Sequence, residues 1–378
     1  MGDSKLRNSN QSGNKLPRSL IIGHKTNDNV VYHMRKTINP APKKSDSAKE
    51  SAKTPALQAV FETVDANSAG QRLDNYLLRW AKGVPKSHVY RIIRSGEVRI
   101  NKKRALPTSR LAEGDIVRLP PTRLAEPPKA GAGISQTKAT ELAAKIPTLF
   151  EDEYLLIIDK PSGLAVHGGS GVSLGAIELL RKARPESKFL ELVHRLDRDT
   201  SGILIFAKKR SALKHLQDQF RERETDKTYL ALVKGDWPAK LKVIDQPLHK
   251  FLLPNGERRV KVTTPEDPEG MRSITLVKVS KRLPGATLLE VTIKTGRTHQ
   301  IRVHLSSQGH PIAGDDKYGD FDWNRQLQKP GTSPSLKRMF LHAWRLQFNH
   351  PVTAERVALQ ADLPPELKAY VDHVSPSE

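Results

Sequence analysis

The residues best suited to chemistry lie together in one short polar segment, His194-Arg195-Leu196-Asp197-Arg198-Asp199-Thr200-Ser201-Gly202. Apolar runs flank this segment on both sides, so it is predicted to be a turn between two buried strands. Asp, Ser and Gly also serve in ordinary turns, where side-chain oxygens bond nearby backbone. Asp197 differs because Arg195 and Arg198 flank it, and adjacent cations favour the charged carboxylate. We therefore expect a carboxylate that can act as a nucleophile or as a base.

Composition and charge indicate the kind of partner. The chain has 378 residues and a formal net charge of +22, which favours a polyanion, with nucleic acid ahead of a membrane surface. It has no cysteine, which excludes disulfides, thiolate catalysis and thiolate metal sites. No apolar run is long enough to span a membrane. We expect a soluble protein of the cytoplasm.

Two other kinds of site are not predicted. The histidines show no His-Glu-x-x-His pattern, and His299, His304 and His310 are spaced five and six residues apart, so we expect no metal site. The glycine-rich segment 167–171 is neither a Walker A sequence nor a dinucleotide fingerprint. ATP and NAD are therefore not expected to bind.

The first part of the chain divides into a tail and a small domain. Residues 1–57 are rich in Asn, Ser and Lys, and we predict a disordered basic tail. In 58–119, apolar spacing predicts a helix from Leu73 to Trp80 and a second helix after Lys86. Short strands are predicted near Ile100 and from 116 to 119.

This small domain resembles an S4 domain, an RNA-binding module. The resemblance rests on Gln71-Arg72-Leu73-Asp74, Lys86-Ser87, Asn101-Lys102-Lys103 and Glu113-Gly114-Asp115. It implies recognition of folded RNA through shape and phosphates. The side chains expected to contact RNA are basic: Arg72, Lys86, Arg91, Arg94, Lys102 and Lys103.

The rest of the chain is predicted to be one larger domain. Pro and Gly residues mark a linker over 120–146, and the second domain is expected over 147–375. Strands are predicted at 154–158, 203–207 and 228–233, with a hairpin over 273–294, a helix over 212–221 and a helix start near 296–305. The order does not follow a regular βαβ alternation. It predicts an α+β fold with a mixed, largely antiparallel sheet.

Several motifs of this larger domain occur together in one family. The 194–202 segment, Lys160-Pro161-Ser162-Gly163, Lys227-Thr228-Tyr229 and Gly296-Arg297-Thr298-His299-Gln300-Ile301-Arg302 resemble the RluA-type pseudouridine synthases. The resemblance implies an isomerase that converts specific uridines of 23S (large-subunit) ribosomal RNA to pseudouridine. It implies no cofactor and no metal. The expected partner is ribosomal RNA, with a pre-ribosomal particle as a possible form of the substrate, and the protein is expected to be a monomer.

The resemblance also implies roles for individual residues. Asp197 matches the catalytic aspartate, Arg297 the arginine that pairs with it, and Tyr229 the tyrosine that stacks on the target base. Tyr229 would otherwise be an ordinary core residue of an alternating strand. The residues expected to bind substrate are His194, Arg195, Ile301 and Leu341, with a role in shaping the turn as the alternative for His194 and a place in the core as the alternative for Ile301 and Leu341. The route taken by Asp197, addition or proton abstraction, stays open.

Two other function classes are compatible with parts of the sequence. A ribosome-assembly factor could use the same basic surfaces without catalysis. A glycoside hydrolase could use Asp197 and Asp199. However, two carboxylates that lie two residues apart in one turn are poorly placed to flank a bond from both sides. A strongly cationic protein also suits a neutral sugar badly, so we rank this alternative last.

Overall fold

The structure, a computed structural model, describes residues 58–81, 84–121, 134–168, 174–329 and 335–375. The predicted tail over 1–57 and part of the predicted linker lie outside these ranges. The described residues of the small domain form a four-stranded sheet in the order β1-β4-β2-β3 with two helices. Its elements are β1 (Val60–Thr63), α1 (Leu73–Trp80), α2 (Lys86–Arg94), β2 (Arg99–Ile100), β3 (Lys103–Arg104) and β4 (Ile116–Leu119).

The small domain has its own hydrophobic core. Leu73 and Leu77 of α1 pack with Val89, Ile92 and Ile93 of α2, as the helical spacing predicts. β2 and β3 are joined by Asn101 and Lys102, which have φ values of 48° and 67°. Two consecutive positive φ angles are typical of the two-residue turn that matches the twist of a hairpin. This turn exposes the side chains of Lys102 and Lys103.

The larger domain is built on one long sheet, as the sequence predicts. The strand order is β10-β13-β14-β9-β15-β8-β6-β5, with β16 on β15 and β7 on β8. Among the described strands the pairing of β15 with β8 is parallel and the other pairings are antiparallel. The strands are β5 (Thr148–Glu151), β6 (Leu155–Lys160), β7 (Glu191–Leu192), β8 (Ser201–Ala207), β9 (Asp226–Lys234), β10 (Val243–Asp245), β13 (Ile274–Leu283), β14 (Ala286–Ile293), β15 (Leu341–Asn349) and β16 (Arg356–Gln360). The expected α+β class is confirmed.

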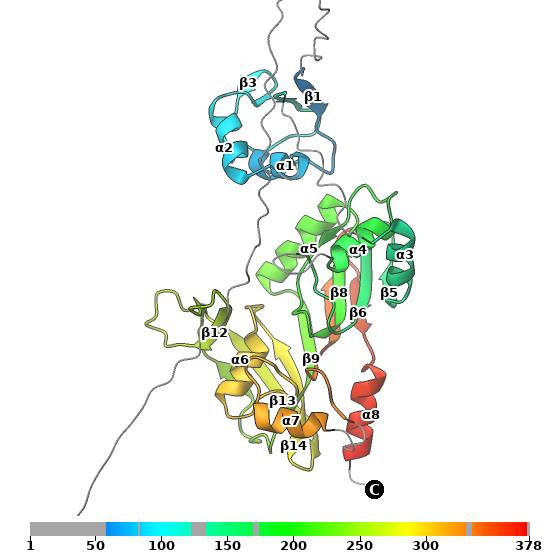
Figure 1. Ribbon diagram of the computed structural model, residues 1–378, viewed down its shortest axis with the longest axis vertical. Helices are drawn as coiled ribbons and strands as arrows, with labels where there is room; N and C mark the ends of the chain where they lie inside the picture. Colours follow the sequence, from blue (N-terminus) through cyan, green and yellow to red (C-terminus); the bar gives the residue numbers. More distant parts are fainter. Residues whose placement is uncertain (1–57, 82–83, 122–133, 169–173, 330–334, 376–378) are drawn as a thin grey trace, which may run out of the picture. The chain divides into compact units, whose positions relative to one another are not determined.

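Helices and one separate hairpin complete the larger domain. The helices are α3 (Gln136–Ala144), α4 (Ala176–Ala183), α5 (Arg210–Glu222), α6 (Gln300–Ser307), α7 (Phe321–Gln328) and α8 (Pro365–Val374), and the hairpin is β11 (Leu248–Leu252) with β12 (Arg258–Val262). In Figure 1, α3, α4 and α5 lie by β5, β6 and β8, whereas α6, α7 and α8 lie by β13 and β14. No described helix is long and apolar enough to cross a membrane.

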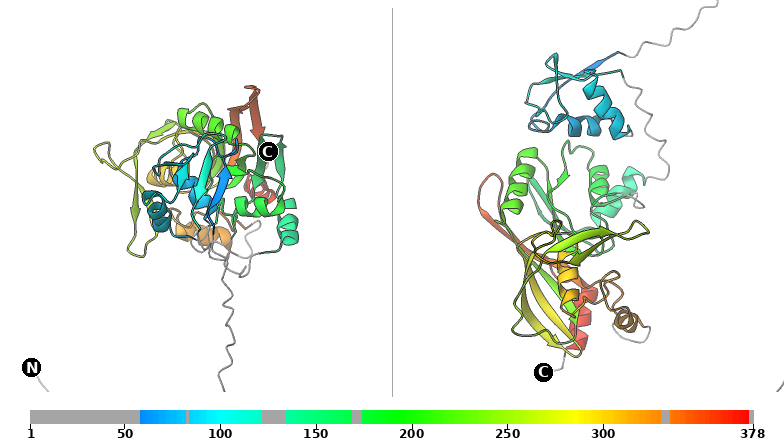
Figure 2. Two further views of the ribbon diagram at one scale, coloured as in Figure 1. Left: turned by 90° about the horizontal axis from the view of Figure 1, so that it is seen from above. Right: turned by 90° about the vertical axis from the view of Figure 1, so that its left-hand side faces the viewer.

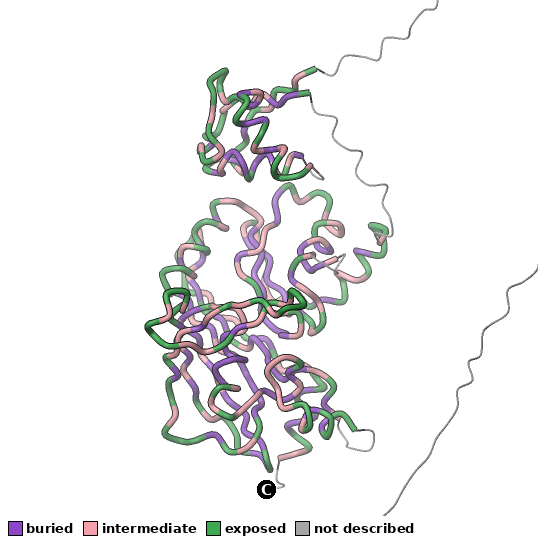
Figure 3. The backbone as a smooth tube through the Cα atoms, turned by 60° about the vertical axis from the view of Figure 1, so that its left-hand side comes forward, coloured by how far each residue is buried: buried purple, intermediate pink, exposed green. Residues whose placement is uncertain are grey.

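Alternating side chains divide the core between the two faces of the sheet. Along β8, Ile203 and Ile205 pack in the cluster that includes α5, whereas Leu204 and Phe206 pack in the cluster that includes α4. Along β9, Leu230 packs in the cluster that includes α8, which lies beside the yellow strands in Figure 2. The buried residues therefore come from the strands of the sheet and from the helix faces that pack on them, and Figure 3 marks them in purple along the backbone.

Three neighbouring strands bring the functional segments together. Tyr229 on β9 pairs with Ala343 on β15, and Ala343 pairs with Gly202 on β8. Gly202 has a φ of +108°, and a Cβ at this position would lie 2.3 Å from the carbonyl oxygen of Ala343. Only glycine fits so close to the next strand. The 194–202 turn thus leads into β8, which is separated from the strand that carries Tyr229 by β15 alone.

Candidate active site

The 194–202 turn is hydrogen-bonded to the end of β6 and to the segment that follows it. The Lys160 ammonium donates hydrogen bonds to the carbonyl oxygens of Pro161, Leu164 and Arg198, at 2.8, 2.7 and 2.9 Å. Ser162 Oγ donates to the carbonyl of Asp199 at 2.8 Å. Lys160 is fully buried, and burial lowers its pKa to about 7. The bonds to Arg198 and Asp199 fix the backbone of the polar turn directly after Asp197, so Asp197 is carried by a stiff loop.

Asp197 forms an ion pair across the pocket with α6. Arg302 Nη1 lies 3.1 Å from Asp197 Oδ2. The Asp197 side chain keeps 22% of its surface exposed, whereas the Arg302 side chain keeps only 4%. The carboxylate is therefore oriented by a buried guanidinium while it stays accessible to a substrate.

Arg302 is itself fixed by further partners. Its Nε and Nη2 donate to the two oxygens of Asp315, both at 2.7 Å, and the Asp315 side chain is 1% exposed. The guanidinium also lies over the ring of Tyr318, 5.2 Å from the ring centre. Burial alone would lower the pKa of Arg302, but the bonds to Asp315 and Asp197 outweigh it and leave the pKa raised. The arginine is thus a permanently charged and immobile partner for Asp197.

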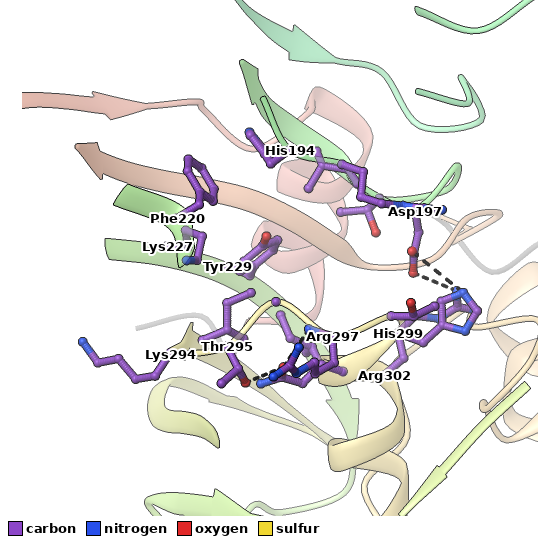
Figure 4. A pocket seen from close by; sticks show the side chains of 18 of the residues that line it. His194, Asp197, Phe220, Lys227, Tyr229, Lys294, Thr295, Arg297, His299 and Arg302 are labelled. Atoms are coloured by element: carbon purple, nitrogen blue, oxygen red, sulfur yellow. Dashed lines mark hydrogen bonds and ion pairs between the residues drawn. The ribbon is translucent and has the colours of Figure 1, made fainter. Parts of the chain in front are cut away.

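His299 approaches Asp197 from a second direction. Its Nε2 lies 3.8 Å from Asp197 Oδ1, and its Nδ1 lies 2.9 Å from the hydroxyl of Tyr318. Burial lowers the pKa of His299, although the charge of Asp197 opposes this shift. The backbone of His299 is left-handed, with a φ of 53°, an unfavourable conformation for a residue with a Cβ. This strain places the imidazole at the start of α6, facing the carboxylate (Figure 4).

Tyr229 forms the apolar wall of the same pocket. It is 9% exposed, and the pocket around it also includes Ile301 and Leu341, which are 5% and 4% exposed. Burial raises the pKa of the Tyr229 phenol, and the negative charge of Asp197 adds to this effect. Tyr229 is therefore a neutral ring that faces the space in front of the carboxylate, as Figure 4 shows.

The pocket has a volume of about 470 Å³. This lies within the range of sites that hold small organic ligands. One side offers a carboxylate and a guanidinium, and the other offers an aromatic ring and aliphatic side chains. Among the residues that the structure describes, no group of three or more His, Asp or Glu side chains is arranged to hold a metal ion. The arrangement suits a flat polar ring that reacts with a carboxylate.

The structure corrects the expected partner of Asp197. Arg297 lines the pocket, but its Nε donates to the carbonyl of Arg272 at 3.4 Å, and its backbone N–H donates to Gln300 Oε1. Within the described residues, the arginine paired with Asp197 is Arg302, five positions later. The reason is the position at which α6 begins. The helix starts at Gln300, so Arg297 precedes it, whereas Arg302 lies in its first turn and faces the carboxylate.

His194 is engaged within the protein. Its ring stacks on Phe220 at 4.9 Å, and its Nε2 accepts a hydrogen bond from the backbone N–H of Ile205. Burial lowers the pKa of His194 to about 3, which keeps the ring neutral and able to accept this bond. Of the two roles that the sequence leaves open for His194, these contacts favour shaping the turn over binding substrate. Arg195, in contrast, is exposed at the pocket.

The basic residues expected on the small domain divide into two groups. Arg72 is engaged by Asp74, with Nη2 to Oδ2 at 2.6 Å. The other side chains are exposed: Lys86, Arg91, Arg94, Lys102 and Lys103. Arg72 therefore contributes to the packing of its own domain, whereas the exposed group is accessible to a polyanion.

Several site residues were missed by sequence reasoning. Arg302 and His299 occur in the recognised motif, and the i to i+3 spacing from His299 could have placed both on the side of the helix start that faces Asp197. Asp315 and Tyr318 have no comparable signal. They follow α6 by several residues, and only the folded chain shows that they bond Arg302 and His299.

Comparisons with known proteins agree with this geometry. Residues 154–307 match the family described as RNA pseudouridylate synthase, and residues 71–117 match the S4 domain. A relative from Yersinia pestis is 52% identical over 314 residues, which cover 83% of this chain and 94% of the relative. The chain therefore belongs to the RNA pseudouridylate synthase family. The predicted enzyme class and the S4 domain are confirmed.

The relatives carry more specific names. The Yersinia pestis protein is named Ribosomal large subunit pseudouridine synthase C. The protein of the same name from Escherichia coli (strain K12) is 52% identical over 315 residues, with 83% of this chain and 96% of the relative covered. A solved structure, Human RNA Pseudouridylate Synthase Domain Containing 4, has a TM-score of 0.51 at 26% identity, and covers 63% of this chain and 97% of its own.

Proposed function

We propose that this protein converts specific uridines of large-subunit (23S) ribosomal RNA to pseudouridine, with Asp197 as the catalytic carboxylate. The observation that carries this proposal is the accessible Asp197 carboxylate, paired with buried Arg302 in the same pocket as the Tyr229 ring. The names of the relatives that cover most of this chain support ribosomal RNA as the substrate. The reaction breaks the bond between ribose C1′ and N1 of uracil, turns the base, and joins C5 to C1′, while the C5 proton is lost and N1 gains one.

The residues of the pocket have separate roles in this proposal. Asp197 adds to C1′ of the ribose, adds to the base, or removes a proton from the ribose, and each of these roles requires a carboxylate at a fixed position. Arg302 orients that carboxylate. Tyr229 stacks on the uracil after the nucleotide has left its helix, which recovers part of the cost of unstacking. Ile301 and Leu341 exclude water on the same side of the base.

The surrounding basic groups hold the RNA. Arg195 and Arg297 lie at the pocket, where they can contact the strand next to the target nucleotide. The exposed cations of the S4 domain add affinity that falls with salt: Lys86, Arg91, Arg94, Lys102 and Lys103. We assign the activity to a cytoplasmic monomer that acts on ribosomal RNA, free or in an assembling particle.

The experiment that tests this function is a map of pseudouridines in large-subunit ribosomal RNA. Cells that lack this protein should lose pseudouridine at specific positions. The wild-type gene should restore these positions, and Asp197→Asn should not. An unchanged map in the deletion strain would instead indicate an assembly factor that binds RNA without modifying it.

A further inference from the structure

The pocket contains a cation that the proposed chemistry does not use. Lys227 lies on β9, is 8% exposed and lines the pocket. Its ammonium donates to Thr225 Oγ1 at 3.0 Å and lies 5.0 Å from the ring centre of Phe220. Among the described residues no carboxylate lies within ion-pair distance of it. A buried ammonium without an acidic partner is costly, so its presence calls for a reason.

The position of Lys227 relative to Tyr229 is informative. The two residues are two apart on one strand, so their side chains leave the same face of the sheet, about 6.6 Å apart along β9. In Figure 4, Tyr229 lies between Lys227 and Phe220 on one side and Asp197 on the other. If the base stacks on Tyr229 and its ribose lies at Asp197, the Lys227 end of the pocket is left open to the backbone of a flanking nucleotide.

A second cation lines the same end of the pocket. Arg223 follows α5 with a left-handed φ of 66°, and its side chain is exposed at the pocket. Its guanidinium has no ion pair within the described part of the chain. The other cations at this end are already engaged: Arg221 pairs with Asp218 at 2.6 Å, and Lys294 lies 3.4 Å from Asp226. Two cations thus remain with donors that no protein group uses.

We propose that Lys227 and Arg223 form a phosphate-binding subsite that holds the RNA backbone next to the nucleotide stacked on Tyr229. This inference rests on the proposed function and adds a specific contact to it. An RNA phosphate supplies the missing anion and can accept from both side chains. Burial lowers the pKa of Lys227 to about 8 in the free protein, and a bound phosphate would favour the charged form. The subsite determines affinity and placement of the RNA and takes no part in bond breaking.

The test compares salt dependence of binding with turnover. Full-length protein is bound to a large-subunit ribosomal RNA transcript between about 50 and 200 mM salt. Lys227→Met and Arg223→Asn should each reduce the slope of log affinity against log salt by about 0.7, the value for one phosphate contact on single-stranded RNA. Asn is used at 223 because it tolerates a left-handed backbone. At saturating RNA, both variants should convert uridine at close to the wild-type rate.

Matched variants separate charge from packing. Lys227→Arg keeps a cation and should keep the wild-type salt slope. Lys278→Met removes an exposed lysine of β13 that pairs with Glu290, and it should leave both slope and turnover unchanged. Thermal unfolding of Lys227→Met should occur at or above the wild-type temperature, because the variant buries no ammonium. A lower unfolding temperature would assign Lys227 to stability.

The outcomes distinguish this inference from the proposed function. If Lys227→Met loses turnover at saturating RNA with an unchanged salt slope, Lys227 acts on the base, and the phosphate subsite is wrong. An unchanged slope with unchanged turnover also overturns it. If Lys227→Met and Arg223→Asn each lower the salt slope as expected but the wild-type protein never forms pseudouridine, the proposed function fails while the phosphate subsite stands.

Discussion

The two ends of the active-site pocket differ in how their charged side chains are paired. At one end Asp197, Arg302 and Asp315 are linked by bonds of 2.7 to 3.1 Å, and Arg302 and Asp315 are almost fully buried. At the other end the Lys227 ammonium makes one hydrogen bond, and Arg223 is open to solvent. Both ends line one cavity, with Tyr229 between them.

This difference reflects what each end must do. A catalytic carboxylate has to be in position before the substrate arrives, so its partners come from within the protein. Cations that hold RNA obtain their partners from the substrate, so they are left without anions in the free protein. Changes at the carboxylate end should therefore cost stability and turnover, whereas changes at the cationic end should cost affinity.

The largest effect is expected at Arg302. Arg302→Met leaves the carboxylate of Asp315 buried without its cation, which should lower the free energy of unfolding by about 3–5 kcal/mol. Denaturant unfolding measures this loss, and turnover should fall as well because Asp197 is no longer oriented. Arg282→Met, which breaks an exposed pair with Asp236, should cost at most about 1 kcal/mol.

A double variant refines this prediction. Arg302→Met with Asp315→Asn removes both charges, so it should recover part of the stability but none of the turnover. Equal unfolding free energies for Arg302→Met and Arg282→Met would show that the buried network does not stabilise this end of the pocket.

The next effect concerns pH and the strand beneath the turn. His342 Nδ1 accepts from Ser201, and its Nε2 donates to the carbonyl of Ala361. Burial lowers the pKa of His342 from 6.5 to about 4, so the unfolded chain binds this proton more readily. Above pH 6.5 His342 is neutral in both the folded and the unfolded chain. As the pH falls from 6.5 toward 4, only the unfolded chain takes up the proton, so the free energy of unfolding falls by up to about 3 kcal/mol.

Unfolding followed between pH 7 and pH 4 measures this contribution. His342→Gln should flatten the pH dependence of the unfolding free energy, whereas His373→Gln, at an exposed position, should not. If the two variants respond alike to acid, the burial of His342 does not cause the effect.

A smaller effect is expected from Tyr229. Tyr229→Leu removes the stacking ring, which should cost about 1–3 kcal/mol, or roughly 5- to 150-fold in single-turnover conversion. Tyr229→Phe keeps the ring, so its rate should stay within a few-fold of the wild type. A loss with Phe as large as that with Leu would show that the hydroxyl, and not the ring, is needed.

The smallest effect is expected at Arg297. Because its side chain bonds a backbone carbonyl and not Asp197, Arg297→Gln should weaken RNA binding by less than about tenfold, the equivalent of 1.4 kcal/mol. Turnover at saturating RNA should change far less than in Arg302→Met. The opposite ranking of the two variants would restore Arg297 as the partner of Asp197.

The polar turn and the sheet around it could be predicted from local sequence. The 194–202 segment shows its turn chemistry, and the alternation of side chains along β8 and β9 shows which residues are buried. The helices α1 and α2 were predicted because their apolar residues repeat at helical spacing. These features depend on neighbours within a few residues, and such patterns are visible in a single sequence.

The partners of Asp197 could not be predicted in the same way. The distinction between Arg297 and Arg302 depends on where α6 begins, and helix boundaries are the least certain part of a sequence reading. Asp315 and Tyr318 meet Arg302 only through the loop after α6, so their contacts follow from tertiary structure. Lys227 belongs to a motif of the family, but the sequence does not show that its side chain is buried at the pocket.

The most direct test of the account is a comparison of RNA binding and product formation by purified Asp197→Asn. This substitution removes the charge and keeps the shape of the side chain. We expect RNA affinity close to that of the wild type and a fall in pseudouridine formation of at least about 10³-fold. Turnover at the wild-type rate would contradict the central claim that the carboxylate of Asp197 performs the chemistry.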